Sequence, residues 1–212
     1  MANSNRPSGF TPRRYVNGAP WTGGGNIYSI AASYNTALYI GDPVKSSGTS
    51  DANGVAGIVL GSTTGALRGM IVGLGNSGST TGGQSGMTDL ANFINPSIAY
   101  HPASDVNVWY ALVVDDPNVL FEVQEESNGT QLAATEVGLN QISKAGTGNG
   151  FCSGWQIPSA TGATPNTTAT LQLRLFGLSQ YPAGTNVFGA YAKWLVQINV
   201  HELGHGTGAD GV

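Results

Sequence analysis

Residues 55–74 read VAGIVLGSTTGALRGMIVGL, two apolar runs separated by a polar turn. The runs 55–60 and 67–74 are short and rich in β-branched residues, with Gly, Ser and Thr between them. Directly upstream, residues 51–54 (DANG) form a turn signal, because Asn-Gly supplies the positive φ of a tight hairpin. Short apolar runs bounded by such turns indicate β-strands.

The same pattern extends along the chain. In 171–178, leucines occupy alternate positions, which is the period of a strand. No segment sustains a helical period beyond two turns, so the sequence predicts an all-β fold of barrel or sandwich type. The other expected strands are 27–30, 37–40, 106–114, 120–123 and 194–200.

Composition and turn signals divide the chain into four regions. Residues 75–88 are low in complexity and favour an exposed loop, and 145–170 favour long loops. The expected regions are an extended N-terminal arm at 1–25, a small β-barrel-like region at 26–75, a linker or loop at 76–104, and a β-sandwich- or jelly-roll-like region with a C-terminal tail at 105–212.

Charged residues make up only 9% of the 212 residues, against about 25% in an average protein, while 32 residues are glycine. A hydrophobic fraction of 40% is enough for a core. A surface this poor in charge favours a structural protein that neighbours cover. The net charge of −4 argues against nucleic acid as a direct partner, because phosphate contacts need clustered Lys and Arg.

Targeting signals and membrane segments are not expected. The N-terminus lacks an apolar stretch typical of a secretory signal, and no run approaches the ~20 apolar residues of a membrane span. We therefore expect a soluble chain made in a cytoplasm.

The single cysteine, Cys152, excludes an internal disulfide framework and is interpreted as a buried structural thiol.

The arm is basic, unlike the rest of the chain. Arg6, Arg13 and Arg14 precede every acidic residue, so the first 41 residues carry +3 and the remainder −7. Such an arm could lie on an acidic partner surface, or it could be a solvated tail; both interpretations stay open. Its prolines bias the backbone away from helix, and Gly23–Gly25 would end it as a hinge.

Residues 201–205 (HELGH) match the H-E-x-x-H pattern, in which two His side chains on a helix bind zinc and the Glu activates water. Gly204, Gly206 and Gly208 oppose a helix, and the match directly follows an expected strand. A zinc hydrolase using His201, Glu202 and His205 is therefore a remote alternative, and we expect no metal, no cofactor and no catalysis.

Two other features have more than one interpretation. Asp115 and Asp116 precede Pro117 and favour a turn, although a structural Ca²⁺ site remains an alternative. The four tryptophans could stack on a sugar, but they are scattered singly, so core packing or interface anchoring is the better interpretation.

Five segments carry a family resemblance. They are SGFTPRRYVNGAPWTGGGNIYSI at 8–30, LYIGDPVKSSGTSDANGVAGIVLG at 38–61, LRGMIVGLG at 67–75, WYALVVDDPNVLFEVQEES at 109–127 and ATEVGLN at 134–140. Together they resemble capsid decoration (cement) proteins of short-tailed bacteriophages. These are packing and turn patterns rather than a chemical signature.

The resemblance implies a virion protein, assembled in the bacterial cytoplasm, that binds the outer surface of an icosahedral head and bridges major capsid subunits. It also implies self-association as a homotrimer or homodimer. We expect the arm 2–21 to be the main anchor. The expected capsid contacts are Arg6, Arg13, Arg14, Tyr15 and Trp21. A receptor- or glycan-binding head or tail protein is the alternative.

Overall fold

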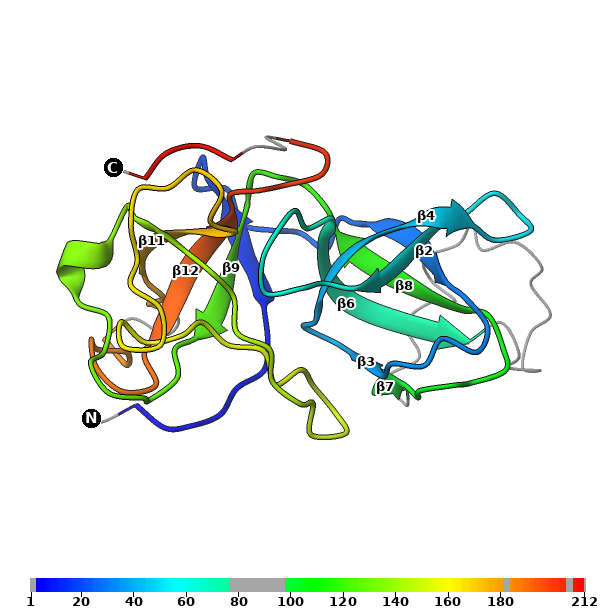
Figure 1. Ribbon diagram of the computed structural model, residues 1–212, viewed down its shortest axis with the longest axis horizontal. Helices are drawn as coiled ribbons and strands as arrows, with labels where there is room; N and C mark the ends of the chain where they lie inside the picture. Colours follow the sequence, from blue (N-terminus) through cyan, green and yellow to red (C-terminus); the bar gives the residue numbers. More distant parts are fainter. Residues whose placement is uncertain (1–2, 77–97, 181–183, 205–207, 212) are drawn as a thin grey trace.

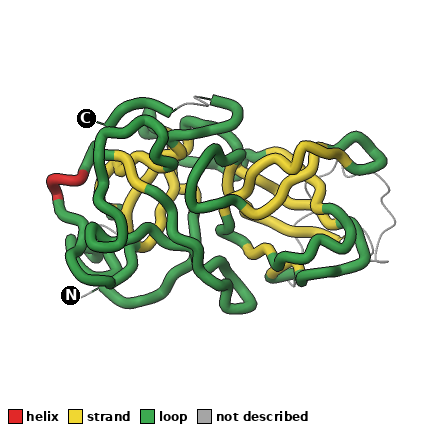
Figure 2. Tube along the Cα trace, in the orientation of Figure 1, coloured by secondary structure: helices red, strands yellow, loops and turns green. Residues whose placement is uncertain are grey.

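The computed structural model describes residues 3–76, 98–180, 184–204 and 208–211. The protein is all-β, as the sequence predicts: the described residues form strands joined by loops, with one three-residue 3₁₀ helix, η2 (Ala134–Glu136). The chain builds two bodies that lie side by side, a barrel and an open sheet (Figures 1 and 2).

The barrel is closed and has the strand order β2-β5-β4-β6-β8. Its pairs are antiparallel except β2–β5, which is parallel. The interior is filled by a cluster of buried side chains that includes Ile30, Val44, Ile71 and Trp109. Its strands are β2 (Asn26–Ile30), β4 (Pro43–Ser50), β5 (Ala56–Leu60), β6 (Gly69–Asn76) and β8 (Trp109–Val114).

The barrel differs from the expected division of the chain in one respect. The strand that closes it, β8, comes from the range assigned to the sandwich rather than from 26–75, and it pairs with both β2 and β6. Part of the expected linker is also ordered into a strand: β7 (Tyr100–His101) pairs with β3 (Leu38–Tyr39). Residues 77–97 of that linker lie outside the described residues.

The second body is one antiparallel sheet with the order β1-β9-β12-β11-β10. In place of the expected sandwich or jelly roll, this one sheet packs against loop side chains, among them Leu132, Trp155 and Ile157, and against barrel side chains that include Met70 and Val114. Figure 2 shows how much of this body is loop. Its strands are β1 (Thr11–Tyr15), β9 (Val119–Gln124), β10 (Asn140–Gln141), β11 (Leu173–Leu178) and β12 (Lys193–Ile198).

The N-terminal segment is a structural part of this sheet rather than a free arm. Residues 11–15 form β1, an edge strand that pairs with β9. Phe10 is 1% exposed and belongs to the core of the sheet body. After β1 the chain turns back on itself, and the Tyr15 amide donates to Ala19 O at 2.8 Å across this turn. The apolar Phe10 side chain and the β9 edge explain why the segment does not project.

Three seams join the two bodies. The core of the sheet body includes Leu67 and Met70, which come from the barrel part of the chain. Leu67 also forms a parallel bridge with His201: the Leu67 amide donates to Val200 O at 3.0 Å, and the Glu202 amide donates to Leu67 O at 2.9 Å. On another seam, the Gln172 amide group donates to the carbonyls of residues 62 and 65 at 2.9 and 3.0 Å.

At the third seam, which we call the clasp, residues 9–10, 40–42 and 153 meet. The Phe10 amide donates to Gly41 O at 2.9 Å, and the Ser153 amide donates to Ile40 O at 2.9 Å. Gly9 and Gly41 both have positive φ, and neither has room for a Cβ beside its neighbours. The clasp therefore ties the N-terminal segment, the barrel and the 145–154 loop together at one point.

We expect Phe10→Ala to lower the free energy of unfolding by about 3–5 kcal/mol, because it opens a cavity in the core of the sheet body. Denaturant unfolding of the two proteins measures the difference. Val16→Ala is the matched control, since Val16 lies in the same segment but is 41% exposed, and its effect should stay within about 0.5 kcal/mol. Equal, small effects for both variants would show that the N-terminal segment is not part of the folded core.

Candidate binding surface

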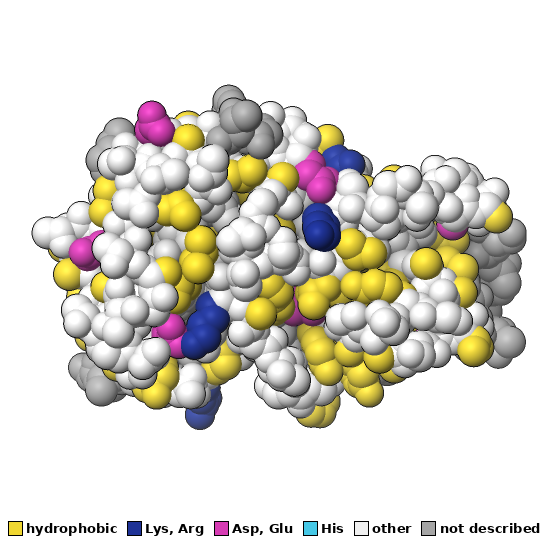
Figure 3. Space-filling view, viewed as in Figure 1, with side chains coloured by type: hydrophobic (Ala, Val, Ile, Leu, Met, Phe, Trp, Pro, Cys, Tyr) yellow, Lys and Arg dark blue, Asp and Glu magenta, His cyan; other side chains and the backbone are white. Residues whose placement is uncertain are grey.

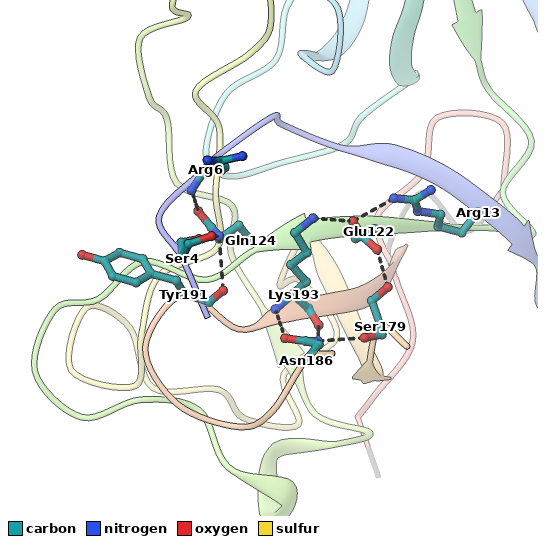
Figure 4. A network of polar contacts seen from close by, with 9 residues as sticks. All are labelled: Ser4, Arg6, Arg13, Glu122, Gln124, Ser179, Asn186, Tyr191 and Lys193. Atoms are coloured by element: carbon teal, nitrogen blue, oxygen red, sulfur yellow. Dashed lines mark hydrogen bonds and ion pairs between the residues drawn. The ribbon is translucent and has the colours of Figure 1, made fainter. Parts of the chain in front are cut away.

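Arg13, which the sequence suggested as a partner contact, lies in an ion-pair network inside the chain (Figure 4). Its guanidinium donates to Glu122 Oε1 at 2.9 Å, and Lys193 Nζ donates to the same oxygen at 3.1 Å. The Ser179 hydroxyl donates to the other carboxylate oxygen. Burial would raise the pKa of Glu122, but these hydrogen bonds and the Arg13 charge hold that pKa below its ordinary value.

The start of the N-terminal segment is bound to the same strand (Figure 4). Gln124 Oε1 accepts the Arg6 amide at 3.0 Å, and Gln124 Nε2 donates to Ser4 O at 2.9 Å and to Tyr191 O at 3.2 Å. The Arg6 side chain itself is exposed. The backbone of this segment is therefore used within the chain, while the Arg6 guanidinium faces outward.

The remaining suggested contacts lie on or beside β1. Tyr15 and Trp21 are half-buried and pack against the core of the sheet body, and Trp21 Nε1 donates to Gly24 O at 3.0 Å. Arg14 is half-buried on β1. Arg13, Arg14 and Tyr15 thus lie on β1, the edge strand of the sheet, and Arg13, Tyr15 and Trp21 hold the segment to its own body. Arg6 and Arg14 are the members that a partner can reach.

The described part of the HELGH segment is a β-bridge followed by a turn, as its glycines predict, and not a helix. His201 is 1% exposed, and its Nδ1 accepts the Leu203 amide at 3.0 Å. The Glu202 carboxylate is bound by Arg68 Nε at 3.2 Å and by the Ser46 amide at 3.0 Å. His205 lies outside the described residues. This geometry lacks the helical face that the zinc motif requires.

A cavity of about 240 Å³ lies between β1 and the start of the barrel. The Asp115 carboxylate lines it, accepting the Asn26 amide group at 2.9 and 3.0 Å and the Tyr28 hydroxyl at 2.5 Å. Burial, and then the Asp115 hydrogen bond, raises the pKa of Tyr28.

Asp116 forms the expected turn, accepting the Asn118 amide at 2.8 Å. Within the described residues, no three His, Cys, Asp or Glu side chains are grouped so that they could hold a metal.

Most cationic side chains are satisfied within the chain. Lys144 pairs with Glu126, and Arg174 donates to the Ala209 and Asp210 carbonyls, in addition to the pairs of Arg13, Lys193 and Arg68 described above. Figure 3 shows the result on one face. The few charged side chains are surrounded by neutral and apolar atoms, and several of them lie beside a side chain of opposite charge. This face is therefore poor in charge, as the 9% of charged residues in the sequence leads one to expect.

Sequence reasoning missed an exposed aromatic at the tip of the loop 145–154. This loop projects between the two bodies at the lower edge of the molecule (Figure 1). Phe151 at its tip is 76% exposed. The sequence feature that could have indicated it is the Asn149-Gly150 pair, which favours a tight turn directly before Phe151.

Searches of protein-family models, curated proteins and solved structures give no match to this chain. No helix among the described residues is long and apolar enough to cross a membrane.

Asp42, at the clasp, makes stability depend on pH. It is 2% exposed and accepts the Tyr39 amide at 2.8 Å, and burial raises its pKa to about 6 despite this bond and one from Ser153. A raised pKa means that the folded state binds the proton more tightly, so this stabilisation is complete below about pH 3.8 and is lost as the pH rises through 6.

We expect Asp42→Asn to remove this dependence, because the amide can keep both hydrogen bonds without a buried charge. The free energy of unfolding of the variant minus that of wild type should rise by up to about 3 kcal/mol between pH 4 and pH 8. Urea unfolding at several pH values measures it. Asp116→Asn, in an exposed turn, controls for the lost charge. A difference for Asp42→Asn that stays constant with pH would contradict the assignment.

Proposed function

We propose that this chain is a structural protein of a bacteriophage particle, which binds the outer surface of an icosahedral head and cements neighbouring major capsid subunits. The observation that carries the proposal is the charge-poor surface described above. The few Lys and Arg side chains are largely paired within the chain, so a broad contact would leave few unpaired ions buried. The sequence resemblance to decoration proteins supports the same assignment.

The joined bodies suit a bridging role. The barrel and the sheet share a core and three seams, so a load applied to one body passes to the other without a flexible linker. A protein that connects two subunits of a shell under internal pressure needs this stiffness. On this proposal the protein lies on the outside of the virion and self-associates as a homotrimer or homodimer.

A structural role also agrees with how the polar groups are used. Glu202, the acid of the HELGH segment, is bound to Arg68 and Ser46. The glycan-binding alternative relied on tryptophan, but Trp109, Trp155 and Trp194 are at most 5% exposed, which supports core packing for these three. We therefore propose that the protein is not an enzyme and does not use its tryptophans as a sugar platform.

Co-sedimentation tests the proposal. Heads of the phage whose genome encodes this chain, prepared without it, should pellet the purified protein at a saturable, fixed number of copies per capsid subunit. Because the surface is poor in charge, the apparent affinity should change less than about three-fold between 50 and 500 mM NaCl, whereas exposed ion pairs would be screened over this range.

Heads that already carry the chain are the control, and they should bind no more of it. If the purified protein stays in the supernatant with undecorated heads, the decoration role is wrong. If it binds but salt releases it, charged contacts hold the protein on the shell, and the exposed Arg6 and the half-buried Arg14 would become the principal candidates.

A further inference from the structure

The turn at the tip of loop 145–154 is built to hold Phe151 in solvent. The Asn149 side chain accepts the amides of Phe151 and Cys152, both at 3.0 Å, and the Asn149 amide donates to Cys152 O at 3.1 Å. Gly150 supplies the positive φ that the turn needs. Three hydrogen bonds therefore fix a four-residue turn whose most apolar side chain contacts little of its own protein.

The stem below the turn is fixed as well. The Lys144 and Gln156 backbones exchange two hydrogen bonds at 2.8 and 3.0 Å. Gly146 and Gly154 pack so closely that neither has room for a Cβ. The Ser153 amide is bound at the clasp, as described above. The loop thus projects as a short, rigid finger that would lose little conformational freedom on binding.

The residues around the tip of the loop carry no charge. Residues 145–156 (AGTGNGFCSGWQ) contain no charged side chain. Gly148 packs against the Tyr39 ring, which stacks on Tyr100 at a centroid distance of 5.2 Å, and Tyr100 is itself 38% exposed. Two tyrosine rings of β3 and β7 therefore lie beside the loop, and Phe151 is the most exposed of the three aromatic residues.

We infer that Phe151 is an anchor side chain that inserts into an uncharged, apolar pocket on a protein subunit of the shell, with Tyr100 contacting the rim of that pocket. This inference rests on the proposed function and names the contact that the proposed binding uses. A rigid aromatic side chain in a desolvated pocket is the usual centre of a protein interface. The neutral loop selects an apolar pocket over a charged one.

A second copy of this chain is a poorer partner for the ring. One cavity of the described residues, about 240 Å³, is lined by the Asp115 and Asp116 carboxylates and Asn26 as well as by Tyr15, Val114 and Val119. A phenyl ring placed there would displace water from carboxylate groups without replacing its hydrogen bonds. This cavity therefore does not suit the ring, and we assign the inferred pocket to the shell subunit.

The test is co-sedimentation of Phe151→Ser with undecorated heads. We expect its affinity to fall by about ten-fold or more, because the buried area of one aromatic side chain is lost, and Phe151→Leu to recover most of the binding. Val106→Ser is the matched control: Val106 is 79% exposed and also lies in an Asx-type turn, but beside the Asp105 carboxylate. It should bind within about two-fold of wild type.

All variants should unfold at the wild-type denaturant midpoint, because neither side chain is in a core. If wild type binds heads and Phe151→Ser binds equally well, the anchor is wrong while the decoration role stands. If wild type itself does not bind, the decoration role fails first. Analytical ultracentrifugation of the purified chain decides the partner: a wild-type oligomer that Phe151→Ser converts to monomer would show that the pocket lies on a second copy.

Discussion

The structure depends on the seams that make one unit of the barrel and the sheet. Leu67 illustrates the constraint: its side chain lies in the core of the sheet body, while its backbone exchanges hydrogen bonds with Val200 and Glu202. The clasp adds a second fixed point, where Gly9 and Gly41 allow the backbones to touch. Because several segments distant in sequence meet at these points, the direction of the 145–154 loop relative to the sheet is fixed.

Part of the fold could be predicted from the sequence. The all-β class, the turn at 51–54 and most strands follow from apolar runs and turn residues. Four strands were missed, and the two longest of them were missed for a physical reason. β4 carries the polar sequence KSSGTS and is held by backbone pairing. β1 carries TPRRY, which resembles a tail until β9, more than 100 residues later, supplies its partner. Period-two patterns show that a strand exists, and they do not show which sheet it joins, so β8 was placed in the wrong body.

The candidate contacts show the same limit. Arg13 and Arg14 are adjacent in sequence and equally charged, yet Arg13 is paired with Glu122 across the sheet, which local sequence cannot reveal. The exposure of Phe151 was equally hidden, since a phenylalanine in a glycine-rich stretch is compatible with core or surface. Asn149-Gly150 predicts the turn, but only the fold determines that the turn points away from both bodies.

We propose that one rigid, charge-poor protein lies on the outside of a phage shell and is anchored by the 145–154 loop. The most direct measurement is a cryo-electron microscopy reconstruction of undecorated heads after incubation with the purified chain. We expect density outside the shell for both bodies at similar local resolution, with the loop tip in a capsid-subunit pocket. Bare shells, or density in which one body is ordered and the other is not, would contradict it.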